Sequence, residues 1–195
     1  MAFTEDDVLT IRTEKTPNPN SLKYVVGRLL IPGGSANFPT PESAQTRSPL
    51  ARRIFAVPGV AGVFIGADFF TVTRVEGVMW GAINEHLAPA LEAFFESGES
   101  VLQGKAPADA PMLGDTATSP ELVAKIQSLL DEKIRPAVAN DGGDITYRGY
   151  ENGVVFLELH GACSSCPSST ATLKMGVETM LRQHLPDHIR EVQAI

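Results

Sequence analysis

Residues 161–170 of this chain read Gly-Ala-Cys-Ser-Ser-Cys-Pro-Ser-Ser-Thr and hold both of its cysteines, Cys163 and Cys166. The run before them, 154–160, has the β-branched, alternating pattern of a strand. The run after them, 170–185, has the apolar spacing of a helix. Gly161 gives the backbone conformational freedom where the chain enters this stretch, and Pro167 restricts the backbone where the chain leaves it. The stretch therefore predicts a short loop that joins a strand to the N-terminus of a helix.

The sequence around this loop predicts a small domain over residues 119–195. Its first helix begins at Ser119-Pro120, because serine caps helices and proline suits the first helical position. Residues 140–144 are a turn signature, followed by strands at 145–148 and 154–160. A last strand is expected at 189–195. The order is helix–strand–strand–helix–strand, with the helices on one face of a short sheet and no parallel βαβ alternation.

The first half of the chain predicts a second domain, over residues 1–97. Strand patterns occur at 8–13 and 22–26, and again at 60–66 and 69–75, which form a probable hairpin. Between these pairs lies an irregular stretch from 27 to 47, part of which is expected to pair with a sheet edge. A short helix opens at Ser48-Pro49.

A longer helix is predicted over residues 79–96, and Pro89 inside it is expected to kink or split it. Considered without its neighbours, Trp80 would be a candidate for stacking on a cofactor. It belongs to an apolar stripe at helical spacing, so core packing is the favoured interpretation.

Residues 98–118 are rich in glycine, proline, alanine and aspartate, and they predict a flexible linker. The expected fold class is therefore α+β. We expect two small two-layer α/β domains, 1–97 and 119–195, joined by this linker.

Composition narrows the possible functions. With 195 residues, 43% of them hydrophobic and 20% charged, the chain is expected to fold rather than to be disordered. The net charge of −7 gives no reason to expect binding to nucleic acid or to an anionic membrane. The acidic N-terminus has no apolar run typical of a targeting peptide. We expect a cytoplasmic protein, or a mitochondrial one if the chain is a mature eukaryotic form.

Two thiols at Cys-x-x-Cys spacing can converge on a metal ion, an iron–sulfur cluster or each other. Soft thiolates select zinc, copper(I) or iron–sulfur clusters over hard cations. The positive end of the helix after Cys166 favours thiolate over thiol. Two core cysteines that are close by chance are the alternative, disfavoured by the glycine, serines and proline around them.

Stable zinc and iron–sulfur sites usually have four protein ligands, and this chain has two cysteines. The candidates to complete the set are the four histidines of the chain, His86, His160, His184 and His188. His160 is near Cys163 in sequence, but at a strand end its side chain can point to the other face. The others are expected to be ordinary surface or packing histidines. The remaining arrangement is a symmetric dimer in which each chain contributes Cys163 and Cys166.

Four runs of the sequence carry a family resemblance. In the second domain they are Arg135-Pro136-Ala137-Val138 with Asp141-Gly142-Gly143-Asp144-Ile145, and 161–174. In the first domain they are Thr16-Pro17-Asn18-Pro19-Asn20-Ser21-Leu22-Lys23-Tyr24 and Phe55-Ala56-Val57-Pro58-Gly59-Val60. The former resemble the C-terminal domain of NifU-type proteins, and the latter resemble the N-terminal domain of the Nfu scaffold subfamily. Together they cover nearly the whole chain except the linker.

The resemblance implies an iron–sulfur cluster carrier or scaffold, not an enzyme. Cys163 and Cys166 would be the metal and cluster ligands, shared across a homodimer. The cluster would be [4Fe-4S], with [2Fe-2S] as the alternative. The implied partners are upstream cluster-assembly proteins and apo iron–sulfur client proteins, which the N-terminal domain would contact.

Two other functions stay open at this point. A thioredoxin-type dithiol oxidoreductase has the same order of strand, Cys-x-x-Cys and helix N-terminus. Against it, no βαβ unit is evident before the pair and no tryptophan adjoins it. A structural zinc site at a dimer interface would use the same two cysteines and would unfold on chelation.

Overall fold

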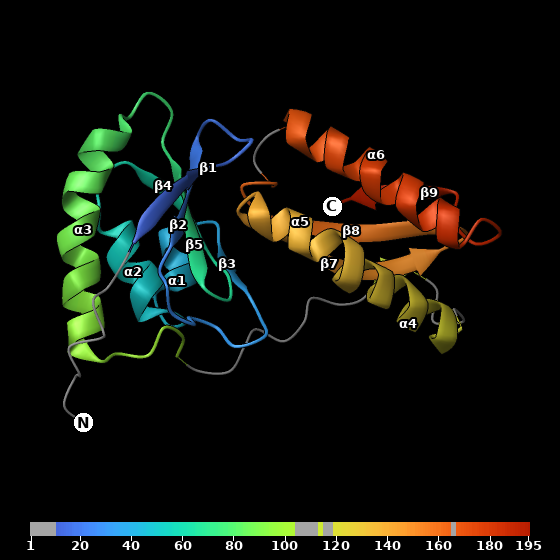
Figure 1. The fold of residues 1–195 in the computed structure, drawn as a ribbon, viewed down its shortest axis with the longest axis horizontal. Helices are drawn as coiled ribbons and strands as arrows, with labels where there is room; N and C mark the ends of the chain where they lie inside the picture. The colour runs from blue at the N-terminus through green and yellow to red at the C-terminus, as the bar shows by residue number, and fades with distance from the viewer. Residues whose placement is uncertain (1–10, 104–112, 115–118, 165–166) are drawn as a thin grey trace. The chain divides into compact units, whose positions relative to one another are not determined.

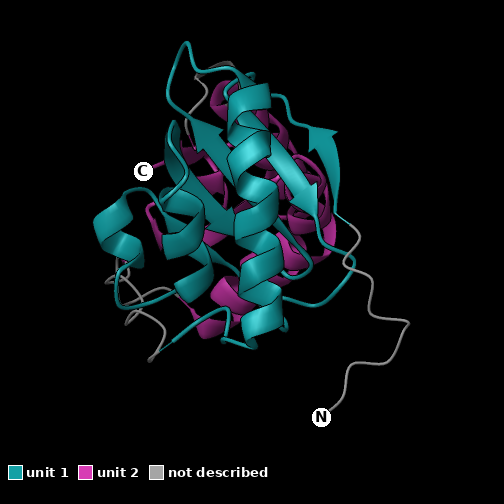
Figure 2. Ribbon diagram, turned by 90° about the vertical axis from the view of Figure 1, so that its left-hand side faces the viewer, with its two compact units in different colours: residues 1–104 teal, residues 105–195 magenta. Residues whose placement is uncertain are grey.

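The computed structural model describes residues 11–103, 113–114, 119–164 and 167–195. The chain divides into two compact units, Met1–Gly104 and Lys105–Ile195 (Figure 2). Each unit has a sheet, helices and a hydrophobic core of its own, which confirms the predicted α+β class. Most of the predicted linker, 98–118, lies outside the described residues, and its boundaries stay a prediction.

The first unit is built on an antiparallel sheet with the strand order β1-β2-β5-β4-β3. Its strands are β1 (Arg12–Lys15), β2 (Ser21–Val25), β3 (Ala36–Phe38), β4 (Val60–Ile65) and β5 (Phe69–Arg74). Strands β4 and β5 form the predicted hairpin. Strand β3 comes from the stretch predicted to be irregular, and its pairing with β4 confirms that part of this stretch joins a sheet edge. The predicted strand at 8–13 is described only from residue 11, and β1 extends beyond it to Lys15.

The helices of the first unit are α1 (Pro41–Ala44), α2 (Pro49–Phe55) and α3 (Trp80–Ser97). Helix α2 begins as predicted, with the Ser48 side chain accepting a hydrogen bond from the backbone of Ala51. The expected split at Pro89 does not occur. Helix α3 continues through this residue, which lies on its exposed face. Its other face is anchored to the core by the buried residues Ile83, Leu87, Leu91 and Phe94.

Trp80 packs against the same core, as the apolar stripe predicts. The guanidinium carbon of Arg74 lies 5.2 Å from the centre of its ring. The Trp80 ring is therefore packed by residues of the first unit, as expected for a core residue.

The second unit has the strand order β6-β7-β8-β9. Its strands are β6 (Leu113–Gly114), β7 (Gly143–Glu151), β8 (Val154–Gly161) and β9 (Glu191–Ala194). Strands β7 and β8 pair antiparallel, whereas β6 and β9 run parallel to their neighbours. The expectation of no parallel βαβ alternation is therefore wrong for the second unit, where helical segments lie between β6 and β7 and between β8 and β9. Helix α6 (Pro167–His184) returns the chain along the sheet, so that β9 runs in the direction of β8.

A continuous helical run precedes β7 and consists of α4 (Pro120–Leu129), the π-helix η1 (Leu130–Ile134) and α5 (Arg135–Asn140). Figure 1 shows this run and α6 lying along the sheet of the second unit. Side chains of both share one core with alternate residues of β7 and β8. The other sheet face carries the polar side chains Thr146, Arg148, Glu158 and His160, together with Val154 and Phe156 of β8. The alternation therefore separates a core face, which includes Cys163 at its end, from a charged face.

Candidate functional site

Cys163 lies in a tight turn directly after β8. Gly161 ends the strand with a left-handed φ of 67°, which a side chain would strain. The backbone N–H of Ser164 donates to the Gly161 carbonyl at 3.2 Å, and the Ser164 hydroxyl donates to the same oxygen at 2.9 Å. Cys163 is 5% exposed and belongs to the core cluster, whereas Ser164 is exposed. The turn thus holds its thiol at the boundary between core and solvent.

The turn that precedes β7 packs against the cysteine turn from the neighbouring strand. The backbone N–H of Ala162 donates to the Gly142 carbonyl at 3.2 Å. A Cβ placed on Gly143 would lie 2.4 Å from the carbonyl oxygen of His160 and 3.0 Å from the Cys163 sulfur. Only glycine allows this approach, so the backbone of residues 142–143 forms one wall beside the Cys163 thiol.

The first turn of α6 holds the cysteine turn from the other side. The Thr170 hydroxyl donates to the Cys163 carbonyl at 2.9 Å. Helix α6 begins at Pro167, immediately after Cys166, and a helix N-terminus favours nearby negative charge. Cys166 itself lies outside the described residues. The expected loop between a strand and a helix N-terminus is therefore present, with Cys163 at its start.

Histidines do not gather at this turn among the residues that the structure describes. His160 points to the polar face, where its Nε2 lies 3.2 Å from the Thr146 hydroxyl and its buried Nδ1 makes no hydrogen bond. Burial is the main cause that lowers the pKa of His160, against the Glu158 carboxylate, which raises it. The exposed His86 and His184 sit on α3 and α6, each with Nδ1 at 2.9 Å from the carbonyl oxygen four residues earlier.

Over the described part of the chain, no group of three histidine, cysteine or acidic side chains is arranged to hold a metal ion. The donor that the structure shows is the thiol of Cys163. A thiolate is the ligand type that iron–sulfur clusters and zinc take, so the chemistry of the turn fits either group.

An ion pair beside the cysteine turn was missed at the level of sequence. Arg135 Nε donates to Asp144 Oδ1 at 2.9 Å and Arg135 Nη2 donates to Asp144 Oδ2 at 2.8 Å. Arg135 Nη1 also donates to Asp131 Oδ1 at 3.2 Å. Hydrogen bonding to Asp144, opposed by burial, raises the pKa of Arg135. Both residues belong to the runs that carry the family resemblance, but only the fold brings their charges together.

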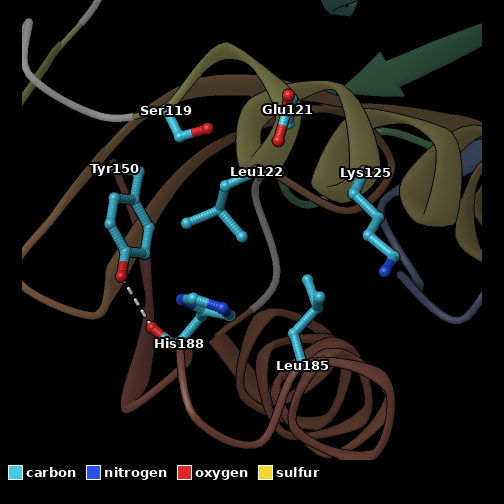
Figure 3. Close-up of a pocket in the computed structure, with 7 residues that line it drawn as sticks. All are labelled: Ser119, Glu121, Leu122, Lys125, Tyr150, Leu185 and His188. Atoms are coloured by element: carbon cyan, nitrogen blue, oxygen red, sulfur yellow. Dashed lines mark hydrogen bonds between the residues drawn. The ribbon is translucent and has the colours of Figure 1, made fainter.

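A groove of about 420 Å³ lies elsewhere in the second unit (Figure 3). It is lined by Ser119, Glu121, Leu122, Lys125, Tyr150, Leu185 and His188. At one side of the groove, the Tyr150 hydroxyl donates to the His188 carbonyl at 2.7 Å. Leu185 follows the last residue of α6, and an 18-residue helix is about 27 Å long. The groove is therefore separate from the cysteine turn, which lies at the other end of that helix.

Comparison with known proteins gives a consistent result for both units. A family model described as NifU-like domain matches residues 126–193, and one described as scaffold protein Nfu/NifU N terminal matches residues 11–98. The human protein named NFU1 iron-sulfur cluster scaffold homolog, mitochondrial, is 43% identical over 178 residues, which cover 91% of this chain and 68% of that protein. The chain belongs to the Nfu/NifU scaffold family.

Two further matches of this Nfu/NifU-family chain are with a Drosophila ananassae protein and a solved structure. The Drosophila protein carries the same name as the human one and is 46% identical over 179 residues, or 91% of this chain. The chain spans 61% of the length of that relative. The solution structure of a NifU-like protein from Saccharomyces cerevisiae is 29% identical, with a TM-score of 0.47, and the match covers 54% of this chain and 93% of that one.

The ranges matched by the two family models include the site residues of this Nfu/NifU-family chain. The NifU-like range of 126–193 contains Cys163 and Cys166, and it also contains Arg135, Gly143 and Asp144. The Nfu N-terminal range of 11–98 contains the whole sheet of the first unit.

Proposed function

We propose that this chain carries iron–sulfur clusters, binding a [4Fe-4S] cluster between two copies and passing it to apo-proteins. The observation that supports this most directly is the cysteine turn. Cys163 is held at the core boundary next to the N-terminus of α6, and Cys166 precedes that helix by one residue. The names of the relatives, as iron–sulfur cluster scaffold homologues, support the same class of cargo.

The dimeric arrangement follows from the number of ligands. Iron–sulfur clusters of the [4Fe-4S] type take four thiolates, and this chain has two cysteines. Two copies related by a two-fold axis would supply the set, with Cys163 and Cys166 from each. A [2Fe-2S] cluster, which also takes four cysteines, is the alternative cargo.

Transfer would proceed by ligand exchange without electron transfer. A client thiolate forms a bond to an iron atom as the bond from Cys163 or Cys166 breaks. The displaced cysteine leaves as a thiolate and takes up a proton from solvent, and the client thiol has lost one. The chain then acts by binding and release, not as an enzyme. Upstream assembly proteins would supply the cluster, and client apo-proteins would receive it.

The compartment belongs to the same proposal. We expected the cytoplasm, or the mitochondrion for a mature eukaryotic form, and the relatives' names, which say mitochondrial, favour the second. Within the described residues, no helix has both the length and the apolar character to cross a bilayer.

The proposal is tested by anaerobic reconstitution of the purified chain. We expect about four irons per dimer, thiolate-to-iron absorption in the visible range, and dimer mass on cluster loading. Cys163→Ser and Cys166→Ser should each abolish the absorption. Met175→Ser is the matched control, since it removes an exposed sulfur from α6 without removing a thiol.

Two results would overturn the proposal in favour of a named alternative. A colourless dimer that holds zinc in place of iron under these conditions, and unfolds on chelation, would indicate a structural zinc site. Appreciable turnover in a disulfide-reduction assay, lost in either cysteine variant, would indicate a dithiol oxidoreductase.

A further inference from the structure

The cysteine turn is supported by a part of the chain that contributes no ligand to it. Gly143 is the first residue of β7 and is the residue whose backbone approaches the Cys163 sulfur. The next residue, Asp144, is paired in the sheet with His160, which is close to the end of β8. Any displacement of the start of β7 would therefore also displace the wall beside Cys163.

The carboxylate of Asp144 accepts three hydrogen bonds from two residues, Arg135 and Ile145. Two guanidinium nitrogens of Arg135 donate to its two oxygens in the bidentate geometry that gives the strongest ion pairs. The backbone N–H of Ile145 donates to Asp144 Oδ1 at 2.8 Å. Because the side chain of Asp144 is only 10% exposed, its charge depends on these bonds rather than on water.

Arg135 is itself anchored where the π-helix meets α5. It follows η1, and its Nη1 donates to Asp131, one turn earlier in the same helical run. Single-turn π-helices cost backbone regularity and are frequent at functional sites. The irregular turn thus places one arginine of the helical run against Asp144, on the strand that borders the cysteine turn.

We propose that Arg135 and Asp144 are positioning residues that hold residues 142–143 against Cys163 and keep the cysteine turn closed. In terms of the proposed function, on which this role rests, the pair would set how readily Cys163 is exposed for ligand exchange. Loss of either partner removes the bidentate link between α5 and Asp144, so the start of β7 loosens and the Cys163 thiol opens to solvent.

A second arginine–carboxylate ion pair that involves β7 provides a matched control. Arg148 Nε donates to Glu158 Oε2 at 2.6 Å, linking β7 to β8. Neither residue is in either of the turns that meet at Cys163. Glu158→Gln therefore removes another arginine–carboxylate ion pair of β7, one that links it to β8 rather than to α5, without releasing the wall at Gly143.

The test is the alkylation rate of Cys163 by iodoacetamide in the full-length, cluster-free chain. Cys166→Ser is the background, so that Cys163 is the only thiol. We introduce four changes into this Cys166→Ser background: Asp144→Asn, Arg135→Gln, the double variant of these two, and Glu158→Gln. Circular dichroism confirms that each variant is folded. If Asp144→Asn or Arg135→Gln does not fold, Arg135→Lys takes its place, because it keeps the charge and loses the bidentate geometry.

We expect Asp144→Asn and Arg135→Gln each to raise the rate about tenfold, or about 1.4 kcal/mol in the opening equilibrium. The double variant should be no faster than the faster single variant, because the two residues act as one unit. Glu158→Gln should leave the rate within about twofold. Removing an anion and removing a cation would change the thiolate fraction of Cys163 in opposite directions. Equal acceleration in both variants therefore indicates loosening of the turn.

Opposite changes in the two variants, no change in either, or an equal acceleration in Glu158→Gln would each overturn the positioning role. This readout needs no cluster, so it is separate from the test of the proposed function. If wild type binds no cluster but the alkylation pattern holds, the carrier function fails and the positioning role stands. In loaded protein, visible circular dichroism of the cluster should change in Asp144→Asn and stay the same in Glu158→Gln.

Discussion

At the scale of single residues, Gly143 marks the closest approach between the start of β7 and the cysteine turn. A Cβ here would meet a backbone oxygen, which cannot rotate away as a side chain can. We expect Gly143→Ala to lower the free energy of unfolding of the second unit by about 1–3 kcal/mol, as other overpacked sites do.

The control for this prediction is Gly176→Ala, in the exposed face of α6. No atom outside the helix backbone lies within 4 Å of a Cβ built there. Alanine should stabilise the helix at this position by about 0.5–1 kcal/mol. Urea unfolding, followed by the amide signals of β7 and β8, measures both variants. A Gly143→Ala variant as stable as wild type would contradict the contact with His160 and Cys163.

His160 gives the second unit a pH dependence of known sign. Burial lowers the pKa of His160 in the folded state, so the unfolded chain binds the proton more tightly. The stabilisation by the neutral imidazole is complete above the unfolded pKa of about 6.5 and is lost as the pH falls towards the folded pKa. We therefore expect the free energy of unfolding to drop between pH 7 and pH 5.

His160→Gln should flatten this pH dependence, since glutamine does not titrate. The exposed His184 on α6 provides the control, and His184→Gln should keep the wild-type slope. Unfolding in urea at the two pH values, with the chain free of cluster, separates the two variants. A wild-type slope in His160→Gln would assign the acid sensitivity to other groups.

At the scale of elements, the first turn of α6 holds the backbone of Cys163 through Thr170. Thr170→Val keeps the shape of the side chain but removes the hydrogen bond to the Cys163 carbonyl. One such bond contributes about 1 kcal/mol, so we expect the cluster to dissociate about fivefold faster from the loaded dimer. The decay of visible absorption in the presence of a chelator measures this rate.

Thr179→Val is the matched control on the same helix. The Thr179 hydroxyl donates to the carbonyl of Met175 at 2.8 Å, on an exposed face away from the cysteine turn. Its loss should leave cluster dissociation unchanged. Equal acceleration in both variants would mean that α6 acts through its overall stability and not through Thr170.

At the scale of the whole molecule, each unit has a separate hydrophobic core and should unfold as its own cooperative transition. Leu157 on β8 is 1% exposed in the core of the second unit. Leu157→Ala should lower the stability of that unit by about 2–5 kcal/mol. Trp80 is the single tryptophan of the chain and lies in the first unit. Its fluorescence transition in urea should keep the wild-type midpoint, and a parallel shift would contradict independent cores.

The sequence by itself determined the features whose causes lie within a few residues. Ser48-Pro49 predicted the start of α2, and the hairpin of β4 and β5 followed from two strand patterns around a short turn. The loop with Cys163 between a strand and a helix was predicted in the same way, because strand and helix periodicity are local signals.

Tertiary structure alone decided which distant residues meet. The continuity of α3 through Pro89 depends on the core beneath it, and the parallel pairing of β9 depends on how α6 packs. The pair of Arg135 with Asp144 spans nine positions, and the contact of Gly143 with Cys163 joins the start of β7 to the turn after β8. The energies of this ion pair and of this contact depend on burial and on the close approach of two backbone segments. A local sequence pattern does not reveal either of these. The sequence therefore determined the thiols and the loop that carries Cys163, whereas only the fold determined the backbone wall of residues 142–143 and the ion pair beside it.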